Sequence, residues 1–320
     1  MAPVVKAGAL LRGKGVKNPF STVVDLADRL DGRGYLAESG LATAVYLALS
    51  LQRPLLLEGE PGVGKTELAK VMSQVLERPM VRLQCYYGID VKGAVYDWNY
   101  AKQMLHIRLA ENSSGESRDA LERDIYAADY LVPRPLLATL QSHPAPVLLV
   151  DEVDRTDEAF EALLLEFLGE FQVSIPEIGT IRAEEAPLVI LTSNRTRDIH
   201  DALRRRCLYY WIDYPAPERE LAILSRRYPH LGDDLLAEVV SFVAELRRQP
   251  LVKRPGLAES LEWVAALEAM GIRTLSPEVV ERTLGLLIKY YDDMDLLRRP
   301  GAAGLNTVNQ ILQEAGGKRG

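Results

Sequence analysis

A glycine-rich stretch of eight residues constrains the fold of this chain more than any other feature. It consists of Gly59, Glu60, Pro61, Gly62, Val63, Gly64, Lys65 and Thr66. The stretch matches the phosphate-binding pattern G-x-x-x-x-G-K-[S/T] in full, with the apolar run Leu55–Leu57 before it and a helical segment, Thr66–Leu76, after it. A chance glycine-rich turn would not need a strand and a helix in these places. The pattern therefore predicts a P-loop held between a strand and a helix.

The predicted loop also indicates which groups bind a nucleotide. Its glycines let successive backbone N–H groups, together with the N-terminus of the following helix, point at phosphate oxygens. We expect Lys65 to neutralise the β- and γ-phosphates of ATP and the hydroxyl of Thr66 to bind Mg²⁺. ATP and Mg²⁺ are therefore the expected cofactors.

Five short apolar runs predict the strands of a parallel sheet. They are Pro54–Leu57, Met80–Tyr86, Pro146–Val150, Leu188–Thr192 and Leu208–Ile212. Runs this short and this continuously apolar are typical of strands that are buried on both faces. The segments Glu67–Glu77 and Glu158–Phe171 have the composition of crossover helices. This alternation predicts an open α/β sheet with its ligand at the carboxyl ends of the strands.

The character of the sequence changes after the fifth run. Pro215 and Pro217 interrupt the chain, and the remainder has helical patterns punctuated by glycine and proline. We expect four parts: a flexible tail over residues 1–20, an α/β nucleotide-binding domain over 21–214, a small all-helical domain over 215–300, and a C-terminal tail over 301–320.

A pair of acidic residues follows the third apolar run. Asp151 at the end of a buried strand is expected to hold Mg²⁺ through water, and Glu152 beside it to polarise the attacking water. The alternative is that both acids merely cap the next helix. Thr156 offers a better cap for that helix, which favours the catalytic interpretation. A kinase for a small metabolite would need no base for water, so Glu152 also argues against that class.

The fourth run ends in Ser193 and Asn194. A side-chain amide at this point can bind both the γ-phosphate and the attacking water. An Asn after a strand is also a common turn former. Because Asn194 follows two other nucleotide motifs in order, we favour a functional role.

Charge and cysteine content bear on partners and location. The formal net charge is −7, from 45 acidic and 38 basic residues, and an acidic chain repels nucleic-acid phosphates. Cys85 and Cys207 have no metal-type spacing. No apolar stretch suggests a signal peptide or a membrane span. These features predict a cytoplasmic protein without a membrane partner, and they count against nucleic acid as the main partner.

The order of these motifs, followed by Ala202–Cys207 and a helical remainder, resembles the AAA+ ATPases. More narrowly, the stretches Leu55–Glu67 and Ala202–Pro215 are similar to the MoxR group. Asp97–Tyr100 with Gln103, and Arg134–Leu137, are similar to the MoxR-like ATPases encoded beside molybdenum hydroxylases such as aerobic carbon-monoxide dehydrogenase. The resemblance covers roughly Leu36 to Leu297.

The resemblance implies a five-stranded parallel sheet, a helical lid and a homo-oligomeric ring that is commonly a hexamer. It also implies a partner with a von Willebrand factor A domain and a client enzyme, here a molybdenum hydroxylase. By position, Lys65 and Thr66 match Walker A, Asp151 and Glu152 match Walker B, Asn194 matches sensor 1, and Arg206, with Arg205 as the alternative, matches the arginine finger. Such a finger, supplied by a neighbouring subunit, stabilises charge on the transferred phosphoryl group.

Two further points follow from the resemblance. The lid of this family carries a sensor 2 arginine, but Glu259 stands at about the expected position, so that either Arg254 or Lys253 substitutes or the interaction is absent. Tyr86 and Tyr87 follow the second run, where a pore loop is expected, although ordinary core packing is an alternative. Residues 172–181 predict a β-hairpin.

Three classes of function are open at this stage. A protein remodeller or maturation factor is favoured by the resemblance and the acidic charge. A nucleic-acid motor or loader shares every nucleotide motif and is the alternative. A small-molecule kinase would transfer phosphate to an acceptor other than water.

Overall fold

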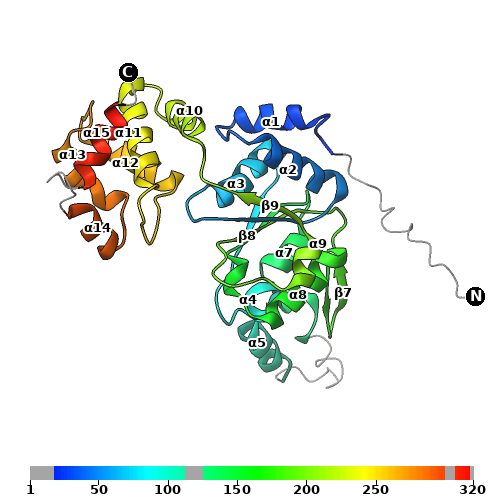
Figure 1. Cartoon of the computed structure of the whole chain (residues 1–320). Coiled ribbons are helices and arrows are strands. Elements are labelled where there is room, and N and C mark those ends of the chain that lie inside the picture. The colour runs from blue at the N-terminus through cyan, green and yellow to red at the C-terminus, as the bar shows by residue number, and fades with distance from the viewer. Residues whose placement is uncertain (1–17, 112–124, 300–306, 318–320) are drawn as a thin grey trace, which may run out of the picture.

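The computed structural model describes residues 18–111, 125–299 and 307–317 (Figure 1). The expected tail over residues 1–20 lies almost wholly outside the described residues, as do residues 301–306 and 318–320 of the expected C-terminal tail. Within the described part of the chain, no helix combines the length and apolar character needed to cross a membrane.

The centre of the fold is a five-stranded parallel sheet, as the apolar runs predict. The strands lie in the order β2-β5-β8-β1-β9. Their bounds are β1 Leu55–Gly59, β2 Met80–Gln84, β5 Val147–Asp151, β8 Leu188–Ser193 and β9 Leu208–Ile212. Every residue of β1, β5 and β8 is buried, because helices cover both faces of these central strands. The prediction of an α/β P-loop fold with five parallel strands is confirmed.

Two separate hydrophobic clusters hold the helices to the sheet. Along β5, Val147 and Leu149 belong to one cluster and Leu148 and Val150 to the other, since successive side chains of a strand point to opposite faces. The first face packs against α1 Val23–Asp31, α2 Ser39–Leu51 and α3 Lys65–Leu76. The second face packs against α7 Pro135–Gln141, α8 Glu158–Glu170 and α9 Asp201–Arg206.

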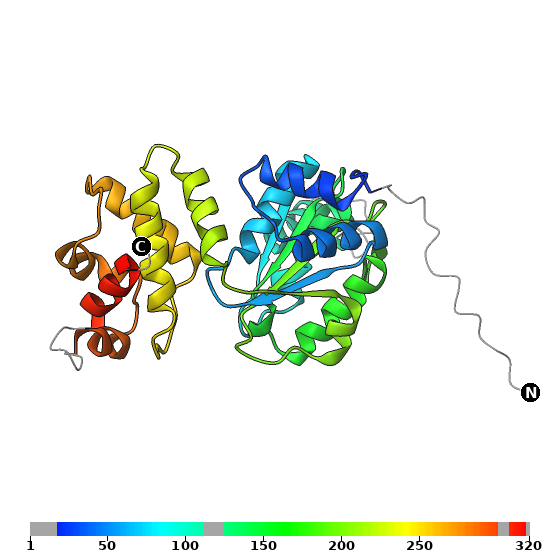
Figure 2. The same cartoon turned by 45° about the horizontal axis from the view of Figure 1, so that its top comes forward.

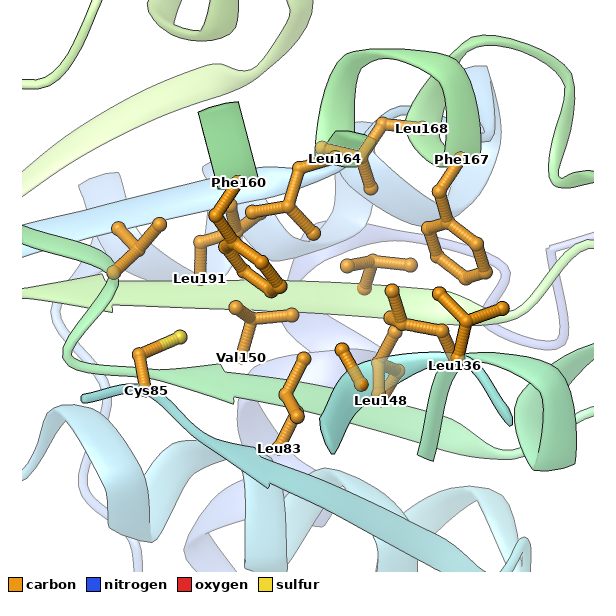
Figure 3. Packing of buried hydrophobic residues seen from close by; sticks show 14 of the residues in the cluster. Leu83, Cys85, Leu136, Leu148, Val150, Phe160, Leu164, Phe167, Leu168 and Leu191 are labelled. Atoms are coloured by element: carbon orange, nitrogen blue, oxygen red, sulfur yellow. The ribbon is translucent and has the colours of Figure 1, made fainter. Parts of the chain in front are cut away.

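Figure 3 shows the second cluster, in which side chains of α8 lie over the strands. Phe160, Leu164 and Phe167 recur on one side of α8 and are buried against Val150 and Leu191. The N-cap of α8 is Asp157, whose side chain accepts from the backbone N–H of Phe160. The expectation that Thr156 caps this helix is wrong. Its backbone N–H closes a 3₁₀ turn, η2 Val153–Arg155, and its hydroxyl donates to the same Val153 carbonyl instead of to the start of α8.

Two small additions extend from the sheet. The first contains α4 Val91–Ala94, β3 Tyr96–Trp98, α5 Tyr100–Glu111, η1 Ala128–Tyr130 and β4 Leu131–Pro133, with β3 and β4 antiparallel. The second is the antiparallel hairpin of β6 Gln172–Ile175 and β7 Gly179–Arg182, so the hairpin predicted for residues 172–181 is present.

The remainder of the chain is helical and lies beside the sheet (Figure 2). Its elements are α10 Pro217–Arg227, α11 Asp233–Leu246, α12 Leu257–Ala269, α13 Pro277–Thr283, η3 Leu284–Leu286, α14 Tyr291–Arg298 and α15 Thr307–Gly317. A cluster of its own, which includes Phe242 and Trp263, forms the core of this part. Residues 307–317, assigned above to a C-terminal tail, form α15, because Val308 and Ile311 are buried in this cluster.

Candidate nucleotide-binding site

The glycine-rich loop connects β1 to α3, as its sequence pattern predicts. Gly62 has φ 79° and Gly64, the N-cap of α3, has φ 96°, a region that glycine enters without steric cost. Gly59 is required for a different reason, because a Cβ atom there would collide with the carbonyl oxygen of Ile212 on the neighbouring β9. Val63 is buried in the core and anchors the loop to the sheet.

Lys65 lies inside the curl of the loop. Its Nζ donates to the carbonyl oxygens of Gly59 and Glu60, each at 2.7 Å, and the residue is only 7% exposed. Burial lowers the pKa of Lys65 from 10.5 to about 8, although the carboxylates of Asp154, Glu60 and others nearby act in the opposite direction. An anionic phosphate beside Nζ would favour the charged amine.

Asp151 ends β5 and brings three elements together. Its Oδ1 accepts from the hydroxyls of Thr66 at 3.2 Å and Thr192 at 2.6 Å. Its Oδ2 accepts from Arg82, at 2.6 Å from Nη2 and 3.1 Å from Nε. The structure thus places Thr66 and Asp151, the two predicted metal-binding residues, side by side. Hydroxyl and carboxylate oxygens are the ligands that Mg²⁺ prefers, so the donor set fits this ion.

Glu152 has a left-handed backbone conformation, with φ 57°. This conformation is uncommon for a residue with a side chain and carries a modest energetic cost. It is held by a hydrogen bond from the Glu152 backbone N–H to the Thr192 hydroxyl at 2.9 Å. The carboxylate accepts from Nε2 of Gln84 at 2.9 Å and pairs with Arg155 at 3.2 Å.

A single pocket of about 370 Å³ joins these groups at the carboxyl ends of the strands. Lys65, Thr66, Asp151, Glu152 and Asn194 all line it, so the structure gathers predicted residues from two strand ends and one helix. Glu60, in contrast, lines a neighbouring polar hollow of about 550 Å³ that also borders Asn194.

The loop after β8 is fixed by a buried carboxylate. Asp154 is 2% exposed and accepts from the backbone N–H of Asn194 at 3.3 Å and from Thr196 at 2.8 Å and 2.7 Å. Sequence reasoning missed Asp154, because an acid three residues after Asp151 resembles an ordinary helix-start residue.

The three arginines at the end of α9 have different surroundings. Arg204 points inward and pairs with the buried Glu58 at 3.1 Å. Arg205 is 80% exposed at its side chain and pairs with Asp201 at 2.6 Å. The Arg206 guanidinium packs against Gly169 at the end of α8. The structure therefore does not bring either candidate finger into the pocket of its own chain.

Sequence reasoning also missed the residue that holds the C-terminal end of α9. Nη2 of Arg53 donates to the carbonyl oxygens of Arg205 at 2.8 Å, Arg206 at 3.0 Å and Cys207 at 3.3 Å. These bonds satisfy carbonyl groups that the end of an α-helix leaves without partners. They hold the backbone of the two residues that carry the candidate fingers.

The start of α12 lies against the P-loop. The backbone N–H of Ala258 donates to the Gly62 carbonyl at 3.0 Å, and Glu259 Oε2 accepts from the Gly256 N–H at 2.9 Å. A Cβ atom on Gly62 would lie 2.8 Å from the same Glu259 oxygen. A carboxylate therefore occupies the place where the resemblance implies the sensor 2 arginine. Lys253 and Arg254 are not among the residues that line the 370 Å³ pocket.

Tyr86 and Tyr87 are 53% and 86% exposed. The alternative that both tyrosines pack in the core is wrong, because they lie in the loop after the edge strand β2, where both side chains are exposed. They border a hollow of about 530 Å³ together with Asp154, Arg155 and Arg197.

Comparisons with known proteins bear on these features. Residues 54–207 match the family described as "AAA domain (dynein-related subfamily)". The gas vesicle ATPase GvpN2 of Halobacterium salinarum is 28% identical over 210 residues, which are 63% of this chain and 58% of that protein. An uncharacterized protein of Staphylococcus saprophyticus, SSP1341, is 20% identical over 251 residues, which are 74% of this chain and 84% of that protein.

Solved structures of similar shape include RuvB, the Holliday junction branch migration motor of Thermotoga maritima. One of them is 16% identical, with a TM-score of 0.42 over 87% of this chain and 72% of RuvB. The family match spans the strands β1, β2, β5 and β8, the P-loop and the acidic pair, and it ends before β9. Residues 54–207, just under half of the chain, are therefore similar to an AAA domain of the dynein-related subfamily.

Proposed function

We propose that this chain is the ATPase subunit of a homo-oligomeric ring that remodels or matures a client protein, using ATP and Mg²⁺ in the cytoplasm. One observation carries the proposal. Lys65, Thr66, Asp151, Glu152 and Asn194 share one pocket of the chain, whereas Arg205 and Arg206 lie outside it. A pocket that neither candidate finger enters, on a chain that carries both fingers outside it, is suited to completion by a neighbouring copy.

The roles of the pocket residues follow from their chemistry. Backbone N–H groups of the non-proline residues in 59–66, together with the N-terminus of α3, hold the phosphates, and Lys65 adds a positive charge at the β- and γ-phosphates. Thr66 and Asp151 would hold Mg²⁺, which supplies charge neutralisation to the phosphate oxygens. Glu152 takes a proton from the attacking water, and Asn194 orients that water against the γ-phosphate.

The client is proposed to contact the exposed end of β2. Tyr86 and Tyr87 present aromatic surface next to the strand that carries partners of both acidic residues. The hairpin β6–β7 is a second candidate contact. Movement of β2 on hydrolysis would reach the tyrosines directly, because Gln84 and Tyr86 are separated by one residue.

The finer assignment rests on resemblance. The similarity of residues 202–215 and 97–100 to MoxR-like ATPases favours a hexameric ring, a partner with a von Willebrand factor A domain, and a molybdenum hydroxylase as client. The relative named a gas vesicle ATPase accords with a role in assembly. Co-purification of a hydroxylase or of such a partner with the tagged chain would support this branch, and repeated isolation of the ring alone would count against it.

The second candidate function is a nucleic-acid motor or loader. The same pocket would serve it, but the net charge of −7 opposes binding to a phosphate backbone. DNA-stimulated hydrolysis that weakens steeply with salt would favour this candidate over the client-protein role.

The test of a shared active site is a mixing experiment. Glu152→Gln removes the base but leaves the finger, whereas the double change Arg205→Ala and Arg206→Ala removes the finger but leaves the pocket. Each variant alone should be nearly inactive. In an equal random mixture, half of the pockets are intact and half of their neighbours carry a finger, so about one quarter of the parent rate should return.

A matched control tests whether mixing any two inactive variants restores activity. Mixing Glu152→Gln with Lys65→Ala should restore no activity, because both changes damage the same pocket. The parent rate per protomer should also rise with protein concentration and then level off. No recovery in the first mixture, together with a parent rate that is independent of concentration, would mean that each chain is catalytically complete.

A further inference from the structure

Arg82 is a cation at the phosphate pocket that the roles given above leave unused. It lies on the edge strand β2, where Leu83 faces the cluster beneath α8 and Arg82 and Gln84 point to the opposite face. Its guanidinium donates to Oδ2 of Asp151 from Nη2 at 2.6 Å and from Nε at 3.1 Å. It also donates to Oε1 of Gln84. Arg82 and Lys65 are the two cationic residues among those that line the pocket.

The position of Arg82 brings it within reach of bound phosphates. Thr66 and Arg82 contact the two oxygens of the same carboxylate, so the guanidinium and the Thr66 hydroxyl lie a few ångströms apart across Asp151. The Arg82 side chain is 49% exposed, whereas Asp151 is 5% exposed at its side chain. A half-exposed arginine can change partner by rotating its long stem, while the buried carboxylate stays in place.

A bound metal ion would change the balance at Asp151. Mg²⁺ held by Thr66 needs Asp151 as an acceptor for its water shell, and a divalent cation repels a guanidinium at this distance. The triphosphate offers that guanidinium several anionic oxygens in the planar arrangement that arginine recognises with two hydrogen bonds. Both effects move Arg82 in the same direction, away from Asp151 and toward phosphate.

Among the described residues of the helical part, none lines the phosphate pocket with a guanidinium. Glu259 presents a carboxylate beside Gly62 at the start of α12, and that carboxylate is engaged with the Gly256 N–H. A phosphate-binding arginine in the same chain must therefore come from another element, and Arg82 of β2 lines the pocket.

We propose that Arg82 is a phosphate-binding residue that exchanges Asp151 for the γ-phosphate when Mg²⁺ and ATP bind. The inference rests on the proposed binding of Mg²⁺ and ATP in this pocket. The exchange frees Oδ2 of Asp151 to accept from the metal's water shell. Because Arg82 lies beside the acidic pair that faces the γ-phosphate, its contribution distinguishes ATP from ADP.

The test compares equilibrium dissociation constants of the full chain for a non-hydrolysable ATP analogue and for ADP. Both are measured by isothermal titration calorimetry with Mg²⁺ and again with a chelator. Arg82→Ala should weaken binding of the analogue with Mg²⁺ by about tenfold to one-hundredfold, as expected for a lost charge-assisted hydrogen bond, and binding of ADP by less than about threefold. Arg82→Lys keeps the charge and loses the fork, so its constant should lie in between.

Arg134→Ala is the matched control. Arg134 is also a half-exposed arginine, 44% exposed, and it pairs with Asp97 at 3.6 Å outside the pocket. This variant should bind both nucleotides as the parent does. If Arg82→Ala does not fold, as judged by circular dichroism, Arg82→Lys decides the matter through the same difference between analogue and ADP.

Any of three results would overturn the inference. Equal weakening of analogue and ADP would mean that Arg82 only supports the pocket. Tighter binding of the analogue in Arg82→Ala would mean that Arg82 merely competes with the metal for Asp151. Lys65→Ala tests whether the pocket itself is correctly assigned. If Lys65→Ala binds nucleotide normally, the pocket has been wrongly assigned. If Lys65→Ala loses nucleotide binding and Arg82→Ala binds the analogue as the parent does, only the role of Arg82 is refuted.

Discussion

The pKa of Lys65 makes nucleotide binding depend on pH in a predictable direction. Burial of Nζ inside the P-loop lowers this pKa to about 8 in the free protein. Phosphate binding favours the charged amine, so the pKa rises again in the complex. The free protein must therefore take up a proton to bind nucleotide above pH 8, and affinity should fall as the pH rises through that value.

The size of the effect follows from the titration curve. With a pKa of about 8, Lys65 is about nine-tenths charged at pH 7 and about one-tenth charged at pH 9. If the complex holds the amine fully charged, affinity for nucleotide falls about tenfold between these two pH values. Binding should take up about 0.1 proton at pH 7 and about 0.9 proton at pH 9.

Isothermal titration calorimetry measures this uptake directly. ADP with Mg²⁺ is titrated into the protein at each pH in two buffers of different ionisation enthalpy, and the difference in heat gives the number of protons taken up. Lys65→Arg is the control, because a guanidinium stays charged throughout and should abolish the change. Equal proton uptake by the parent at pH 7 and pH 9 would refute the lowered pKa.

Three predictions concern stability and are checked by unfolding measurements. The pKa of Lys65 in the folded protein lies below its ordinary value of 10.5, so unfolding takes up a proton between about pH 8 and 10.5. The free energy of unfolding should therefore rise as the pH increases through that window, and this rise should be missing in a Lys65→Met variant. Gly59→Ala should lower the free energy of unfolding by about 2–4 kcal/mol, because its Cβ would collide with the Ile212 carbonyl. Gly285→Ala, where a Cβ meets nothing within 4 Å, should change it by less than about 0.5 kcal/mol. Equal melting temperatures of the two variants would contradict the collision at Gly59. Glu220→Ala should cost about 3–5 kcal/mol, because it removes the carboxylate that pairs with the largely buried guanidinium of Arg247, and the exposed Glu278→Ala should cost less than about 1 kcal/mol.

Local sequence patterns determined most of the fold. The five apolar runs became the five strands, and the eight-residue loop lies where its pattern requires a strand before it and a helix after it. These features depend on neighbours in the chain, through strand burial and backbone conformation at glycine, so a linear pattern records them. The same reasoning placed Asp151, Glu152 and Asn194 at strand ends, where the parallel sheet brings such residues into one pocket.

Helix ends and the helical part were less well predicted. The helical patterns after Pro217 did not indicate that α13, η3 and α14 are separate elements, although Leu284, Leu287 and Ile288 all reach the same core. The cap of α8 falls on Asp157 rather than on Thr156, since either residue type can cap a helix and only the turn η2 decides between them.

Tertiary structure alone decided the surroundings of the site. Arg82 reaches Asp151 across 69 residues of sequence, and two polar side chains on an otherwise apolar strand, Arg82 and Gln84, were the available signal. Elements far apart in the chain likewise determine three other features. These are the ion pair of Arg204 with Glu58, the lowered pKa of Lys65 and the contact of Glu259 with the P-loop. A sequence pattern records which residue follows which. Burial and pairing of charges depend on which surfaces meet, and that is settled only when the chain has packed.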